Sequence, residues 1–321
     1  MRGLPAAGSG TSAGSGAGSV WPMIDGFTTR QVYVSSPMPD KPQPAPPLAF
    51  SLPDRRVLAL CGRDALAFAQ AQFMNDVAAL GDGQWQWNGW LNPKGRVIAL
   101  FALLRLDAET LWLLLAGTDP AELAAKLQRY VFRSKLTLQP RDDLHAAGAF
   151  HAPRTASGAM LARVDDHVEL DMGSDAGARA VQITTAQAPN DANESLRWKA
   201  ADLACGLPHL PASQAEQWTP QQLSLERLQA FSVKKGCYPG QEIVARTHFL
   251  GQAKRGVALF EAEAPVLPGA GVTAGTQALG TAVSVAAHHV LAVLPLESPA
   301  QGLAADGVPL SPRPLLGGLQ R

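Results

Sequence analysis

The residues best suited to chemistry form a short segment around one cysteine, the nine residues KKGCYPGQE that contain Cys237. Two lysines precede the thiol in a loop flanked by glycines, and a helix is predicted to begin at Gln241, with Glu242 in its first turn. A helix N-terminus and nearby cations both stabilise a thiolate, so this pattern predicts a thiol with a lowered pKa. Two interpretations stay open on this chemistry: a reactive or partner-contacting cysteine, or a partly buried structural one.

The remaining cysteines and the histidines carry weaker signals. Cys61 and Cys205 lie between apolar neighbours and are predicted to be core residues. Three scattered cysteines without CxxC spacing predict neither a disulfide framework nor a metal centre, and we expect no metal site. A Cys–His catalytic pair stays an open alternative, because such partners need only meet in space; His248 and the pair at 288–289 are the histidines considered.

Tryptophans are the second group of residues that could bind a ligand. Trp85, Trp87 and Trp90 lie in an alternating stretch and are predicted to pack against a sheet. Trp198 differs in position, because it precedes a Gly-Leu-Pro bend at residues 206–208. An indole at that point could stack on a planar ligand, although the residues alone favour a structural role.

The elements that must position these residues begin near residue 48. The pattern predicts two helices, starting at Asp64 and Asp119, among strands in the order of a ferredoxin-like α+β unit. Residues 140–196 are weakly patterned, and a further helix is expected over residues 219–231. After Lys254, short apolar runs separated by Gly and Pro predict a small all-β module. The expected strands are residues 57–60, 84–90, 97–104, 111–115, 134–139, 160–164, 167–170, 257–260, 281–285 and 290–294.

The first 47 residues differ in composition from the remainder. Residues 3–19 are rich in Gly and Ser, and residues 37–47 are rich in Pro, which predicts a disordered leader. A polyproline ligand for a partner groove is the alternative interpretation. Translation starting at Met23 or Met38 is a further hypothesis.

Composition bounds the function classes. The chain has 321 residues, 46% of them apolar, with 27 basic and 27 acidic side chains that give zero net charge. A neutral chain lacks the basic surplus typical of duplex binders, so we expect no direct nucleic-acid partner. No apolar run approaches the ~18–20 residues that span a bilayer, and no secretory signal is evident. We therefore expect a soluble, cytoplasmic protein without a membrane partner.

The cysteine segment resembles the signature Lys-Gly-Cys-Tyr-x-Gly-Gln-Glu of the YgfZ-type folate-binding proteins, which are relatives of the glycine-cleavage T-protein, GcvT. Further pieces of the family pattern occur in the same order, and the resemblance covers about residues 50–295. The matching signature residues are Lys235, Gly236, Cys237, Tyr238, Gly240, Gln241 and Glu242, followed by Arg246; the further pieces are residues 72–77, 94–96, 130–136, 206–208 and 254–255.

The resemblance implies an α+β fold of ferredoxin-like, GcvT-type domains in a three-domain ring with a C-terminal β-barrel. The expected division is a leader over 1–47, a folate-binding region of two α+β units over 48–250 and the barrel over 251–321. The implied ligand is tetrahydrofolate or a derivative, and the implied role is to support iron–sulfur cluster assembly or repair in client enzymes, including tRNA-thiolating ones. Cys237 is the implied functional thiol and Trp198 the implied folate contact, while Lys235 and Arg246 are expected to form a positive rim for the anionic folate tail.

Departures from the family pattern weaken two of these implications. The acidic residue that T-proteins place two before the bend glycine is Ala204, and a second family tryptophan aligns with Arg55. The aspartate that acts in aminomethyl transfer aligns with Ala99 and Leu100, which cannot move a proton. A folate-dependent aminomethyl or one-carbon transferase is therefore the alternative, and a direct tRNA-binding protein is the third class considered.

Overall fold

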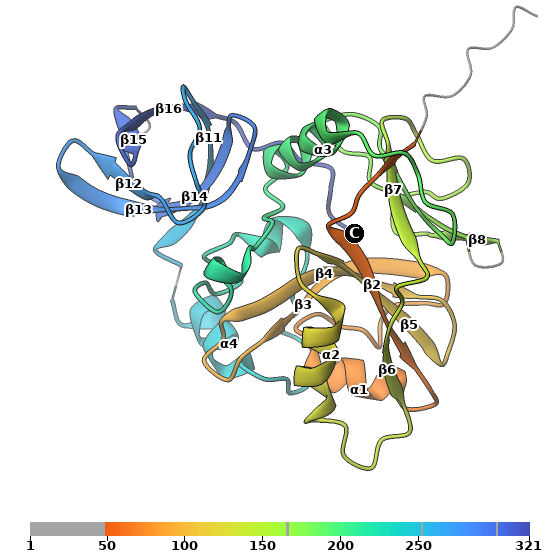
Figure 1. The fold of residues 1–321 in the computed structure, drawn as a ribbon. Helices are drawn as coiled ribbons and strands as arrows, with labels where there is room; N and C mark the ends of the chain where they lie inside the picture. Colours follow the sequence, from red (N-terminus) through yellow and green to blue (C-terminus); the bar gives the residue numbers. More distant parts are fainter. Residues whose placement is uncertain (1–48, 165–166, 252, 300) are drawn as a thin grey trace, which may run out of the picture. The chain divides into compact units, whose positions relative to one another are not determined.

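The computed structural model describes residues 49–321 apart from 165–166, 252 and 300 (Figure 1). The expected leader at 1–47 lies outside the described residues. The described chain forms two five-stranded sheets and a closed six-stranded barrel. Neighbouring strands in the sheets and in the barrel are antiparallel. Across the described ranges, we find no helix with the length and apolar character required to cross a membrane.

The first sheet has the strand order β3-β4-β5-β2-β6 and carries helices α1 and α2. Its strands alternate between two buried faces, which explains the nearly continuous apolar runs in the sequence. Leu113 and Leu115 pack with the helices, whereas Trp112 and Leu114 face a second core. The elements are β2 (Arg55–Cys61), α1 (Ala65–Gln72), β3 (Gln84–Leu91), β4 (Val97–Arg105), β5 (Thr110–Ala116), α2 (Pro120–Gln128) and β6 (Thr137–Pro140).

Helix α2 begins where the sequence predicts it. The side chain of Asp119 accepts hydrogen bonds from the backbone N–H groups of Ala121 and Glu122, and Pro120 occupies the first helical position. The predicted helix at Asp64 is also present as α1, although Asp64 makes no side-chain cap to that helix. Five strands accompany these helices, one more than the ferredoxin-like order contains.

The second sheet has the order β1-β7-β10-β9-β8 and is followed by helix α3. Only β8 and β9 were expected from the sequence. Strand β1 has only two residues and β7 is rich in Ala and Gly, so neither has a strong alternating pattern. Strand β10 does alternate, with Val181 and Ile183 buried, but it is only five residues long. The elements are β1 (Phe50–Ser51), β7 (His145–Ala149), β8 (Ala162–Val164), β9 (His167–Asp171), β10 (Ala180–Thr184) and α3 (Ala192–Ala204).

The prediction of a helix over residues 219–231 is wrong. This stretch forms turns around a 3₁₀ helix, η2 (Leu225–Leu228), flanked by Ser224 and Gln229 in the left-handed region. The apolar residues suggested a helical face, but Leu223, Leu225 and Ala230 all lie in the core, and Asn75 donates a hydrogen bond to the Gln229 carbonyl. Tertiary contacts thus outweigh local helix propensity. Helix α4 (Gln241–Phe249) does begin where predicted, and η1 (Ala212–Gln214) precedes both.

The C-terminal module is a closed barrel, which agrees with the all-β module predicted after Lys254 and with the barrel that the resemblance implies. Its strand order is β11-β14-β13-β12-β15-β16, so it leaves no open sheet edge. The expected α+β class with a C-terminal β-barrel is therefore confirmed. The strands are β11 (Arg255–Ala262), β12 (Gly271–Ala274), β13 (Gln277–Ala286), β14 (His289–Pro295), β15 (Leu303–Ala305) and β16 (Val308–Arg313).

Candidate functional site

Cys237 lies on an exposed loop directly before α4, between two buried side chains of the same motif. Lys235 and Tyr238 are buried, whereas Cys237 and Gly236 are exposed. Cys237 forms no disulfide and no hydrogen bond within the described part of the chain. The loop therefore presents the thiol to the outside, which does not fit the interpretation of a partly buried structural cysteine.

Lys235 anchors the loop from beneath. Its Nζ donates hydrogen bonds to the carbonyls of Gln70, Phe73 (2.6 Å) and Asn75 (3.1 Å), at the C-terminal end of α1. A helix C-terminus attracts cations, so this position suits an ammonium group. Burial lowers the pKa of Lys235 to about 8. The expectation that Lys235 forms a positive rim is wrong, because its charged group faces inward and only 6% of the residue is exposed.

Two other motif residues hold the loop against α4. The Gln241 side-chain amide donates to the carbonyl of Lys235 at 3.1 Å, and the Tyr238 hydroxyl donates to the carbonyl of Ser232 at 3.2 Å. Burial raises the pKa of Tyr238 to about 12. Glu242 and Arg246 form an exposed ion pair on α4 at 3.1 Å, so Arg246 remains at the surface near the loop.

Gly240 is the motif position with the tightest backbone requirement. It has φ of +79°, and a Cβ there would lie 2.6 Å from the Asn92 carbonyl oxygen and 2.7 Å from Gly95 Cα. The Asn92–Gly95 turn, which follows β3, therefore packs directly on the start of α4. This contact explains why a Lys-Gly-Arg turn far away in the sequence accompanies the cysteine motif.

Gly240→Ala is expected to lower the free energy of unfolding by about 2 kcal/mol or more, because the left-handed backbone alone costs a side chain ~1–2 kcal/mol and the new Cβ meets backbone atoms. Gly236→Ala is the matched control, since a Cβ at Gly236 meets no atom within 4 Å. The free energy of unfolding of Gly236→Ala should stay within about 0.5 kcal/mol of the wild type. Urea unfolding of both variants measures the difference; equal effects would contradict the packing argument.

A pocket of about 460 Å³ lies beside the anchored loop. It is lined by residues of the α1–β3 connection, of the 226–234 segment and of α4, and by Arg321. Burial raises the pKa of Glu226 at its edge. His248 also lines the pocket, but Cys237 does not, and within the described ranges no hydrogen bond joins Cys237 to a histidine. No group of three or more potential metal-binding side chains is found in the described part of the chain.

Trp198, the expected folate contact, lies in the core. Its ring is 0% exposed and packs against Phe50 and Phe150, with the Arg179 guanidinium 4.7 Å from the ring centroid. A ligand cannot stack on Trp198 in this conformation, because protein atoms already cover the ring. Trp85, Trp87 and Trp90 are buried as predicted. Of the remaining cysteines, Cys205 is buried, whereas Cys61 is only partly buried at the end of β2.

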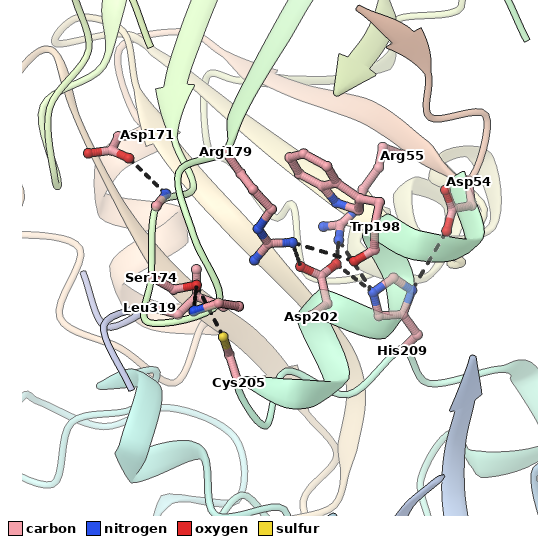
Figure 2. Close-up of polar contacts among 12 residues, drawn as sticks. Asp54, Arg55, Asp171, Ser174, Arg179, Trp198, Asp202, Cys205, His209 and Leu319 are labelled. Atoms are coloured by element: carbon pink, nitrogen blue, oxygen red, sulfur yellow. Dashed lines mark hydrogen bonds and ion pairs between the residues drawn. The ribbon is translucent and has the colours of Figure 1, made fainter. Parts of the chain in front are cut away.

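Figure 2 shows a buried charge cluster beside Trp198 that the sequence analysis missed. Asp202 on α3 accepts hydrogen bonds from Arg55, from Arg179 Nη1 at 2.8 Å and is paired with His209 Nε2 at 2.8 Å. Burial alone would raise the pKa of Asp202, but the charges of Arg179 and Arg55 and the His209 contact outweigh it and hold the pKa below its usual range. A carboxylate four residues after Trp198, on the same helical face, was the available signal.

The cluster also explains the departure at Arg55. Arg55, at the position of the second family tryptophan, is buried and pairs with Asp202. Asp54 next to it lies 3.3 Å from Lys199 Nζ and 3.6 Å from His209 Nδ1. Ala99 and Leu100, at the position of the T-protein aspartate, are both buried and apolar, so the structure places no acid group there.

Two five-stranded sheets with their helices and a closed C-terminal barrel define a GcvT-like fold. The fold is similar to the crystal structure of glycine cleavage system aminomethyltransferase T from Bartonella henselae, with a TM-score of 0.64 over 85% of this chain and 86% of that one. The sequences are 14% identical, so this likeness concerns the fold. No family model matches the chain.

Curated relatives give the closer comparison. The chain is 28% identical over 242 residues to the tRNA-modifying protein YgfZ of Klebsiella pneumoniae (strain 342), covering 69% of this chain and 74% of that protein. It is 29% identical over 246 residues to the protein of the same name from Cronobacter sakazakii, covering 68% and 74%. An uncharacterized protein of Haemophilus influenzae is 29% identical over 217 residues, covering 67% and 73%. The resemblance to YgfZ-type proteins is thus confirmed.

Proposed function

We propose that this chain is a YgfZ-type accessory protein of tRNA modification that binds tetrahydrofolate and supports iron–sulfur cluster assembly or repair in client enzymes, including tRNA-thiolating ones. The observation that carries the proposal is the exposed Cys237 on a loop fixed by Lys235, Tyr238 and Gln241. The similarity to proteins named tRNA-modifying supplies the cellular context.

The chemistry of the thiol supports a role toward a partner rather than within the chain. Cysteine thiolates are the usual ligands of iron–sulfur clusters. A single exposed thiol cannot hold a cluster by itself, but it can contact one that a client protein holds. The rigid loop limits the ordering cost of such a contact, because the backbone on both sides of Cys237 is already fixed.

The folate part of the proposal rests on the fold likeness and on cations near the loop. Lys234 and Arg246 are exposed on either side of Cys237. Positive charge at these positions suits the anionic glutamate tail of a folate. We propose Lys234 and Arg246, in place of the buried Lys235, as the charged rim.

Cys237→Ala is expected to abolish the cellular activity while leaving the fold intact, because the exposed side chain makes no contact that stabilises the loop. The measurement is mass spectrometry of thiolated tRNA nucleosides in a bacterial strain that lacks its own YgfZ-type protein and carries either the wild type or the variant. The wild type should restore the thiolated nucleosides and Cys237→Ala should not.

Cys61→Ser is the control for the loss of a thiol elsewhere, since Cys61 lies at the end of β2 and not in the motif. This variant should restore the nucleosides as the wild type does. Full restoration by Cys237→Ala would overturn the proposed role of the thiol.

A further inference from the structure

The C-terminal segment, residues 315–321, leaves the barrel after β16 and returns to the core shared by the two sheets, where Figure 1 marks the C-terminus. Leu319 is 1% exposed and belongs to the same core cluster as Trp87 and Trp198. That cluster also contains side chains of both sheets, for example Trp112 and Ile183. The segment therefore takes up interior volume between elements of the α+β region, although it follows the barrel in sequence.

Hydrogen bonds hold this segment along its length. Trp87 Nε1 donates to the Leu319 carbonyl at 2.8 Å, and the Leu316 N–H donates to the Ala204 carbonyl at 2.8 Å. Gly317 exchanges two bonds with Asp175: its N–H donates to the carboxylate at 2.9 Å, and its carbonyl accepts from the Asp175 N–H at 3.0 Å. The partners of these bonds, and the core position of Leu319, are left unfilled when the segment leaves, so a ligand that displaces it must replace these contacts with its own.

Arg321 ends the segment with a planar group in a defined cradle. Its Nη2 donates to the carbonyls of Asp171 at 3.0 Å and Gly173 at 2.9 Å, and its guanidinium lies 5.5 Å from the centroid of Trp85. The amino-pyrimidinone edge of a pterin presents the same chemistry: a flat, cyclic guanidine with N–H donors for carbonyls and a face for an aromatic ring.

Unpaired donors lie next to this cradle. Arg179 is fully buried, and its Nε and Nη2 have no hydrogen-bond partner among the described residues; the same holds for Trp198 Nε1. Arg179 is close enough to Arg321 that its charge, after burial, contributes to lowering the pKa of Arg321. Buried donors are nearly always paired in proteins, so an acceptor brought to this place would find unpaired donors on Arg179.

We propose that residues 315–321 are an intramolecular competitor for the folate, and that the pterin ring enters the place that Leu319 and Arg321 hold. The inference rests on the proposed function, since it takes the ligand from it. Displacement would free the Trp87 N–H and expose the Asp171 and Gly173 carbonyls and the Arg179 donors to the ring. Only molecules whose segment has left the core can bind the folate, so the apparent affinity for the folate falls as the fraction of molecules with the segment in place rises.

An engineered disulfide that holds residues 315–321 in place, and that can be reduced again, tests the proposal on the full chain. A Cβ at Gly317 would lie 3.9 Å from Cγ of Asp175, so Asp175→Cys/Gly317→Cys brings two thiols near disulfide distance. The titration uses 5-formyltetrahydrofolate, which is stable without thiol reductants, in calorimetry. A background with Cys61→Ser, Cys205→Ala and Cys237→Ser removes the other thiols, including Cys205, which lies 3.3 Å from the Ser174 hydroxyl beside the new cysteine at 175. The oxidised form should bind at least about tenfold more weakly than the same protein after reduction.

Arg321→Ala gives a second, independent measurement. Loss of the guanidinium weakens the hold of the segment, so this variant should bind 5-formyltetrahydrofolate more tightly than the wild type. Arg313→Ala, which removes an exposed barrel arginine, is the matched control and should leave binding unchanged. Equal binding of the ligand by the oxidised and reduced forms, or weaker binding by Arg321→Ala, would overturn the proposal that residues 315–321 compete with the folate. Absence of binding by every form would instead overturn the proposed folate function, and the competitor with it.

Discussion

Asp202→Asn is expected to lower the free energy of unfolding by about 3–5 kcal/mol, because it removes the anion from a buried cluster of cations. Both Arg55 and Arg179 direct their guanidinium groups at this carboxylate, and its side chain has no exposed surface (Figure 2). An amide keeps the shape of the carboxylate but not its charge. The two arginines would then be buried without the carboxylate that both contact, which is the costly state.

Urea unfolding followed by tryptophan fluorescence measures this loss. Glu261→Gln serves as the control, because it removes the acidic partner of an exposed pair with Arg313 and should leave the free energy of unfolding almost unchanged. A double variant, Arg179→Met with Asp202→Asn, should lose less than the sum of its single changes, since both remove the same contact. Additive losses would contradict the proposed coupling.

The same cluster predicts how stability depends on pH. The pKa of Asp202 in the folded chain lies below its usual range, so the folded state binds this proton less readily than the unfolded state, whose carboxyl titrates near ~3.9. The contribution is therefore present above about pH 4 and is lost as the pH falls toward the folded pKa. Asp202→Asn should flatten the decrease of stability between about pH 4 and pH 2 relative to the wild type.

The Cys237 motif could be read from the sequence because its requirements are local. The glycine at 240, the helix start at Gln241 and the thiol are consecutive, and turn chemistry depends on neighbouring residues. Barrel strands β11, β13 and β14 and helix α2 were predictable for the same reason, because alternation and capping are short-range patterns, whereas β12, β15 and β16 were not predicted. Most of the second sheet was not predicted, because β1 and β7 depend on pairing with neighbouring strands rather than on a pattern of their own, and β10 is too short to stand out.

The contacts of Lys235 and Trp198 could not be predicted, because both depend on residues far away in sequence. Lys235 binds carbonyls about 160 residues earlier, as the separations of 160–165 positions show. Trp198 is covered by Phe50 and Phe150, and its neighbour Asp202 pairs with Arg55, 147 positions away. A sequence pattern indicates that such residues matter, but only the fold shows whether the side chain faces solvent or core.

Lys235→Met is the second change with a large expected effect, and it separates a structural lysine from a ligand-binding one. Methionine fills a similar volume but cannot donate hydrogen bonds. The carbonyls of Gln70, Phe73 and Asn75 would each lose a donor in a buried place, for a combined cost of about 3 kcal/mol or more. A lysine of an exposed rim would give almost no change in stability on the same substitution.

The consequence for function is displacement of Cys237. The lysine joins the end of α1 to the loop, so its loss should increase amide hydrogen exchange at residues 235–240 and in the turn after α1. Lys234→Met is the matched control, because the neighbouring lysine is exposed and should leave both unfolding and exchange unchanged. If Lys235→Met weakened folate binding but altered neither, its side chain would act on the ligand directly. If it altered both, as we expect, the lysine of the signature holds the thiol in place.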